Sequence, residues 1–301
     1  MDPLVQTVAN EIRADLASGR LVLPSLPDIV FKVASLLNDP SASGERIAEM
    51  VGKDPALSAR FLRMANSAYF PGMRPVADLR RAVVRLGHKV IKHLITTLAV
   101  SKLYDVRAHP VARPYLVELW RQSTLVASLS ELIARRHGHL EAEVAMLAGL
   151  IHRIGALPVI VRAERTPEVL ASRQHASTLI ELLHCEVGRV IVTGWRFPPE
   201  LVAVVTEHDN LERDSEGLAD YVDVVQVALL IAFRGTELPW GAADWNRVPA
   251  VLAVALDEKD TEDLVAFAGA RVGELRRLLG PVDGGRMGRP GAPPATRQAV
   301  G

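Results

Sequence analysis

Apolar residues recur at helical spacing along nearly the whole stretch from position 28 to position 233, and no run alternates as a half-buried strand would. Ile29, Val33 and Leu36 form one such stripe, which runs into an Asn-Asp-Pro turn signal at positions 38–40. Later segments keep the same period, so the core has to be built from packed helices. The pattern therefore predicts an all-α protein.

A spacer that contains Pro110 and Pro114 divides the helical pattern into two blocks. After the second block two more helices are expected, and the last 21 positions contain four Pro and five Gly with almost no large apolar residues, which is typical of disorder. We predict an N-terminal helix in 1–22, a first block over 23–107, a second block over 115–235, a helical cap over 236–280 and a disordered tail over 281–301.

The charge balance excludes a general attraction to nucleic acid or to an anionic membrane, because Lys plus Arg and Asp plus Glu both total 35. The single cysteine, Cys185, cannot form an internal disulfide and fits a reducing compartment. The N-terminus lacks the apolar core of a signal peptide, and the apolar stretch 222–233 is too short to cross a bilayer. We expect a cytoplasmic protein with no membrane partner.

Three of the nine histidines lie in successive helical segments of the second block: His152, His184 and His208, the last followed by Asp209. Packed side by side, these helices could bring the three rings to one point, as in helical enzymes that hold metal ions with His and Asp. A histidine on an apolar helix face is more often a core residue whose ring nitrogens are hydrogen-bonded. Cys185 adjoins His184, and we expect a buried, inert thiol that points away from the histidine.

Dense motifs carry a resemblance to a known family. DPAL at 54–57 and ANSA at 65–68 lie in the first block, and WRQS at 120–123, GLIHRIG at 149–155, HCEVG at 184–188 and GWRFPPELV at 194–202 lie in the second. Over about residues 20 to 235 the chain resembles the HDOD domain family. The resemblance implies two packed helical blocks, the second similar to an HD-type phosphohydrolase, and a role in bacterial signalling without the complete metal-binding set.

Position by position, the resemblance implies a broken two-metal site. Gln122 stands where an active relative places a histidine, His152 is followed by Arg153 in place of an aspartate, and Leu229 replaces the last acidic ligand. A guanidinium brings positive charge and no lone pair, so it cannot bridge two cations. We therefore expect no metal, no cofactor and no catalytic residue.

The remaining pocket could still bind an anion or a nucleotide, because Arg153 offers a fork suited to phosphate or carboxylate. Arg153 could instead pair with Glu207 or Asp209 and join helices, and we favour that structural role. The pocket positions are Gln122, His152, Arg153, His184, His208, Asp209 and Leu229.

Residues 43–66 have the outline of a helix-turn-helix, with Arg60 and Arg63 on the second helix. The alternative, which we favour, is that Leu57, Phe61 and their apolar neighbours bury this helix and leave the arginines as solvated charges. A local basic run near Gly87 could meet DNA or an acidic protein. Together the candidate contacts are Arg60, Arg63, Arg80, Arg81, Arg85, Lys89 and Lys92.

These features predict a non-catalytic regulatory module that acts through an unidentified signalling protein. Two alternatives stay open: a DNA-binding or transcription-linked regulator that uses residues 43–66, and a residual metal-dependent phosphohydrolase.

Overall fold

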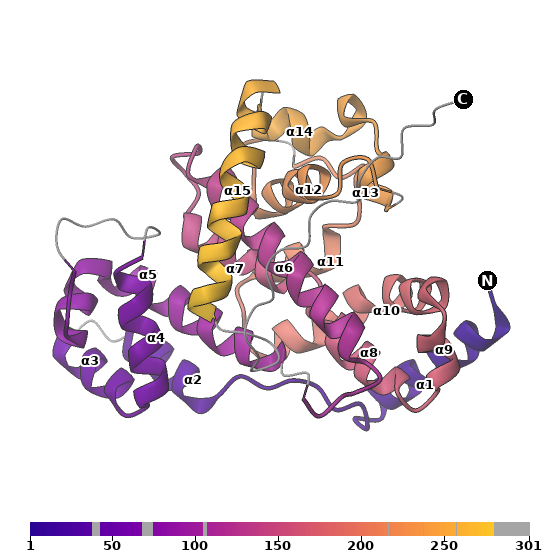
Figure 1. Cartoon of the computed structure of the whole chain (residues 1–301), viewed down its shortest axis with the longest axis horizontal. Coiled ribbons are helices and arrows are strands. Elements are labelled where there is room, and N and C mark those ends of the chain that lie inside the picture. Colours follow the sequence, from indigo (N-terminus) through magenta and orange to yellow (C-terminus); the bar gives the residue numbers. More distant parts are fainter. Residues whose placement is uncertain are drawn as a thin grey trace, which may run out of the picture.

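The structure is a computed structural model that describes residues 1–37, 43–67, 75–104, 107–215, 217–236, 238–256 and 258–279. Throughout these residues the regular elements are α-helices with two short 3-10 turns, and no strand occurs among them (Figure 1). The all-α prediction is confirmed. The tail predicted at 281–301 and the turn at 38–40 lie outside the described residues.

In the described part of the first block, α2, α3 and α4 pack against the longer α5. Polar side chains set three of the helix starts: Ser43, Asp54 and Asp78 each accept a hydrogen bond from the backbone N–H three residues later. Gly87 interrupts α5 with a φ of 74°, a conformation that glycine adopts readily. The helices are α2 (Asp28–Leu37), α3 (Gly44–Gly52), α4 (Pro55–Ala65) and α5 (Leu79–Ser101).

The second block contains seven helices and holds the three histidines. α6 packs along α7 and α12, whereas α10 packs against α8 and α11. Two glycines of the GLIHRIG motif explain the close packing: a Cβ at Gly149 would lie 2.6 Å from the Cα of Ala127, and one at Gly155 would collide with the backbone of His184 and Gly188. The helices are α6 (Arg113–Ala134), α7 (Ala142–Ile151), α8 (Ala156–Ala163), α9 (Pro167–Ala171), α10 (Arg173–Gly194), α11 (Pro199–Glu207) and α12 (Tyr221–Ala232).

Beyond the second block, α14 (Pro249–Val254) packs on α12, and α15 (Glu258–Leu279) runs along α6 and reaches α4 (Figure 1). The last described helix therefore contacts both blocks. Between these elements lie the short helix α13 (Pro239–Ala242) and the 3-10 turn η2 (Trp245–Arg247), and the turn η1 (Lys102–Tyr104) follows α5.

The N-terminal helix α1 (Pro3–Ala17) packs on the second block, against α10 and α8. Arg162 of α8 donates to the Asp15 carboxylate at 2.8 Å, and Arg13 donates to Glu186 of α10 at 3.0 Å. The hydrogen bond from Arg162 lowers the pKa of Asp15. Charged contacts therefore fix α1 beside the helix that carries His184.

One helical stretch, Ala142–Ala163, is long and apolar enough to cross a membrane by length and composition alone. In the fold, 94% of the most apolar window of Ala142–Ala163 is buried, as in the core helix of a soluble protein.

Candidate functional site

Three buried imidazole rings meet between the helices of the second block. His152 ends α7, His184 lies within α10, and His208 ends α11; none of the three is exposed to solvent. The ring centroids of His152 and His208 are 5.0 Å apart, and those of His184 and His208 are 5.3 Å apart. The structure thus brings together the three histidines that the sequence analysis singled out.

Each ring is oriented by the same type of hydrogen bond, from its Nδ1 to a backbone carbonyl of its own segment. Nδ1 of His152 donates to the carbonyl oxygen of Gly149 at 2.7 Å, Nδ1 of His184 to that of Ile180 at 2.8 Å, and Nδ1 of His208 to that of Val204 at 2.9 Å. A carbonyl oxygen only accepts, so Nδ1 carries the proton in all three rings. In the neutral rings every Nε2 therefore carries a lone pair.

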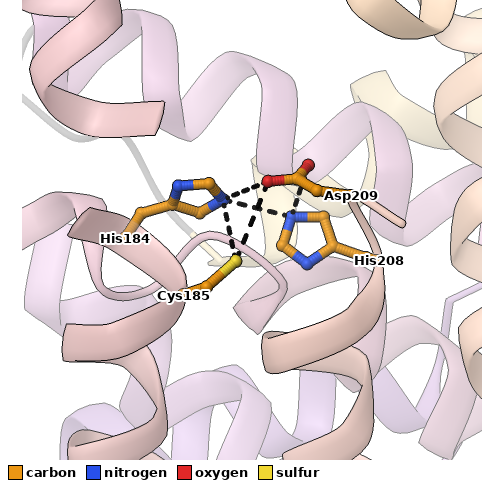
Figure 2. A group of neighbouring side chains, drawn as sticks. All are labelled: His184, Cys185, His208 and Asp209. Atoms are coloured by element: carbon orange, nitrogen blue, oxygen red, sulfur yellow. Dashed lines mark hydrogen bonds and ion pairs between the residues drawn. The ribbon is translucent and has the colours of Figure 1, made fainter. Parts of the chain in front are cut away.

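Asp209 and Cys185 join this cluster, as Figure 2 shows. An oxygen of Asp209 lies 3.0 Å from Nε2 of His184, and the other oxygen lies 3.4 Å from Nε2 of His208. The Cys185 sulfur lies 3.5 Å from Nε2 of His184 and 3.8 Å from Asp209. Our expectation for Cys185 was wrong: the thiol is only partly buried, and it points toward the same centre as the histidine beside it.

Burial and close charges shift the ionisation of these groups. Burial lowers the pKa of His208 to about 4 and that of His152 well below its ordinary value. Burial raises the pKa of the Cys185 thiol to about 12, and the charge of Asp209 adds to this effect. Burial opposes ionisation of Asp209 as well, but the hydrogen bond that a charged His184 ring donates, together with the nearby positive charges, lowers its pKa below the usual range.

Arg153 is the unusual neighbour of this cluster. Its side chain is inserted into the core with only 8% of the residue exposed, and burial lowers its pKa. The guanidinium lies over the ring of Trp240, 5.5 Å from the centroid, and donates to the side-chain oxygen of Gln122 at 3.5 Å. Its Nε finds no hydrogen-bond partner among the described residues.

The pairing of Arg153 with Glu207, which we considered, does not form. Glu207 pairs instead with Arg213 at 2.8 Å. Arg213 also pairs with Asp220 and Asp223 at the start of α12, so it connects the end of α11 to that helix. Asp209 influences Arg153 only through its negative charge, which favours the charged guanidinium.

The remaining positions do not complete a two-metal site. Gln122 of α6 is half-buried and donates to Glu118 at 2.9 Å, and Leu229 is fully buried on α12 and has no ligand atom. With a guanidinium beside the histidines as well, these residues do not fit a pair of divalent ions.

Sequence reasoning missed one residue that holds the site, Gln226. This buried side chain of α12 donates to the carbonyl oxygens of Glu207 and Asn210, at 3.3 and 2.7 Å. The two carbonyls flank His208 and Asp209, so Gln226 fixes the turn that presents them. A glutamine among the Val, Leu and Ile residues of this helix was the available signal.

The basic residues of the first block lie apart from this cluster. Leu57, Phe61 and Met64 bury one face of α4, Arg60 is half-buried and Arg63 is exposed. Arg80 pairs with Glu45, and Arg81 pairs with Asp78 at 3.4 Å, so carboxylates offset part of the positive charge. Arg85 is half-buried and Lys92 exposed on α5, and the side chain of Lys89 lies outside the described residues.

Comparison with known proteins supports the resemblance that the motifs suggested. A candidate metal-dependent phosphohydrolase from Shewanella amazonensis SB2B is 28% identical and superimposes with a TM-score of 0.78 over 92% of this chain and 99% of that one. An HDOD domain protein of unknown function from Geobacter sulfurreducens is 24% identical, with a TM-score of 0.61 over 92% and 97% of the two chains.

A protein of Treponema pallidum (strain Nichols), itself uncharacterized, is 22% identical over an alignment of 251 positions that covers 78% of this chain. The match covers 47% of that protein, so the chain spans about half the length of this curated relative. The sequence model of the HDOD domain matches residues 23–211, more than half of the 301 positions and the full span of the three histidines. By this match the chain belongs to the HDOD domain family.

Proposed function

We propose that this protein is a non-catalytic regulatory module that acts through a protein partner and retains a degenerate form of the HD-type metal site. The observation that carries the proposal is the buried guanidinium of Arg153, held by Trp240 and Gln122 beside the histidine cluster. Membership of the HDOD family fits a regulatory role.

The charge of Arg153 works against a hydrolytic pair of divalent ions. At an effective dielectric of about 20, a cation 4 Å from the guanidinium would meet roughly 4 kcal/mol of repulsion per unit charge. Rotation of the side chain toward solvent would relieve this repulsion but would supply no carboxylate in its place. It would also break the contacts with Trp240 and Gln122.

A hydrolysis assay tests the proposal that the protein has no catalytic activity. Purified protein is incubated with a chromogenic phosphodiester and manganese, iron or zinc, beside a His152→Ala variant as the matched control. We expect the two proteins to be indistinguishable with every metal, because the two-ion site cannot form. Metal-dependent turnover that disappears in His152→Ala would overturn the proposal in favour of the residual phosphohydrolase.

The mixed charge of the surface formed by α3 and α5 favours binding of a protein over binding of nucleic acid. An open hollow there is lined by residues of both charge signs: Glu45, Glu49, Asp78, Arg80 and Arg81. Nucleic acid presents one sign of charge and favours an unbroken basic surface. A protein surface with both signs can match this arrangement.

Site-specific cross-linking in cells tests the partner. A photoreactive residue placed at Glu49 should give one discrete protein adduct, whereas the same residue at the exposed Glu168 of α9 should not. Adducts of nucleic acid at Glu49 would favour the DNA-binding alternative, and equal labelling at both positions would contradict a defined partner surface.

A further inference from the structure

Two ring nitrogens face each other in the core without a proton to share. Nε2 of His184 and Nε2 of His208 are 3.4 Å apart, although Nδ1 of each ring already donates to a carbonyl of its own helix. Two neutral rings held in this way would point lone pairs at one another. An added proton or a metal ion between the two nitrogens would remove this repulsion.

Asp209 and Cys185 supply two further donor atoms. One ligand atom from each of His184, Cys185, His208 and Asp209 lies within 4.8 Å of all the others. Nε2 of His184 lies 3.0 Å from one oxygen of Asp209, 3.4 Å from Nε2 of His208 and 3.5 Å from the Cys185 sulfur, which is 3.8 Å from the same oxygen (Figure 2). Nε2 of His208 lies 3.4 Å from the other oxygen of Asp209. Ligands about 2.0 to 2.3 Å from a tetrahedral zinc ion are separated from one another by roughly 3.3 to 3.7 Å. The contacts of 3.4 and 3.5 Å match this spacing, and the carboxylate of Asp209 lies beside both imidazoles.

A protonated His184 would account for only part of this arrangement. It would explain the contact of the ring with Asp209, and the Cys185 thiol could then donate to the same carboxylate at 3.8 Å, but the lone pair of His152 would stay unused. A second observation concerns His152, which is fully buried and whose Nε2 has no hydrogen-bond partner among the described residues. Its ring packs against that of His208, so a further lone pair belongs to the same cluster.

We propose that His184, Cys185, His208 and Asp209 bind one tetrahedral divalent ion of the zinc class. Two imidazoles, a thiolate and a carboxylate are ligands that zinc accepts, and the two anionic ligands balance its charge. Binding replaces the thiol proton of Cys185, which leaves to solvent as the sulfur–metal bond forms.

The proposed site differs from a hydrolytic pair of ions. Four protein ligands leave no open position for water or substrate, which is the arrangement of structural zinc sites. Each helix contributes two consecutive residues, one pair within α10 and the other at the end of α11. The ion would therefore join these helices, and this inference does not rest on the proposed regulatory function.

Cobalt provides a specific test, because Cys185 is the only cysteine in the chain. Cobalt titrated into metal-stripped protein should give the visible bands of tetrahedral cobalt and a near-ultraviolet sulfur-to-cobalt charge-transfer band. That band should be absent in Cys185→Ser. The cobalt affinity should fall at least ~10-fold in Cys185→Ser and in Asp209→Asn, and it should not change in the control Glu212→Gln on the same turn.

Two further measurements use the unaltered protein, so they do not depend on whether the variants fold. Mass spectrometry of protein purified without chelator should find one zinc per chain, and zinc should slow the modification of Cys185 by a thiol reagent. Substoichiometric metal together with the absence of a cobalt–sulfur band would overturn the proposal, as would two ions per chain. One zinc together with phosphodiester hydrolysis would overturn the proposed function but not this site.

Discussion

The carboxylate of Glu131 on α6 accepts two hydrogen bonds from the guanidinium of Arg271 on α15, at 3.0 and 2.7 Å, across 140 positions of the chain. Only 2% of the Glu131 side chain is exposed, so this paired contact lies in the core. It joins the last described helix to the helix that carries Gln122.

Loss of this pair should destabilise the protein. Arg271→Ala leaves the buried Glu131 with only Arg135, and we expect the free energy of unfolding to fall by roughly 3 kcal/mol, as for a broken buried ion pair. Urea unfolding monitored by circular dichroism measures the change. The exposed Arg277 of α15 is the control, since its replacement by alanine should cost less than about 0.5 kcal/mol. Equal losses in the two variants would refute the special role of Arg271.

A methyl group at Gly155 should destabilise the protein, because it would press on the segment of α10 that carries His184. The added Cβ would overlap the backbone of His184 and Gly188, and relief of that overlap should cost about 1–3 kcal/mol or more. Thermal unfolding of Gly155→Ala should show the loss. Gly273 of α15 has open space around it, so Gly273→Ala should instead raise stability by up to ~1 kcal/mol through helix propensity. A Gly155→Ala protein as stable as the parent would show that α8 and α10 do not approach as closely as described.

The contact of α1 with α8 should depend on pH. Because the hydrogen bond from Arg162 lowers the pKa of Asp15 in the folded state, this contact stabilises the protein above the ordinary value of 3.8 and loses its effect as the pH falls through the folded pKa. Asp15→Asn should therefore be less stable than the parent at pH 6, and the gap should narrow toward pH 3. Denaturant unfolding across this range, with Glu168→Gln as the control, measures the gap. A gap independent of pH would exclude ionisation of Asp15 as its cause.

DNA should not bind through the first block. α4 buries its apolar face, and carboxylates offset Arg80 and Arg81, so we expect no salt-dependent mobility shift with duplex DNA. A variant with Arg60→Ala and Arg63→Ala should behave like the parent. A shift that weakens steeply with salt and is lost in this variant would instead support a helix-turn-helix at 43–66.

Local periodicity predicted most of the helices, because an apolar stripe and a helix-starting Asp or Pro are visible over a few residues. Asp54 with Pro55 at the start of α4 and Gly87 at the break within α5 are such local signals. The path of α15 could not be predicted in this way, since its contact with α4 joins segments far apart in the chain. Pairing such as that of Glu131 with Arg271 becomes visible only in the folded protein.

The candidate site was predictable in its residue types but not in its geometry. Motif positions indicated His152, His184, His208 and Arg153, whereas the approach of the Cys185 sulfur to the ring of His184 is visible only in the folded protein. The partner of Arg153 was equally hidden, because Trp240 comes from α13, beyond the matched family region.

Each of the three imidazoles is oriented by a carbonyl of its own segment, at Gly149, Ile180 and Val204. Ring orientation therefore does not depend on what occupies the centre. An ancestral protein could lose one ligand or gain another while the rings kept their directions, so the occupant of the centre could change during evolution without a new fold. A few substitutions at the centre could therefore convert a catalytic site into one that only joins helices, or the reverse.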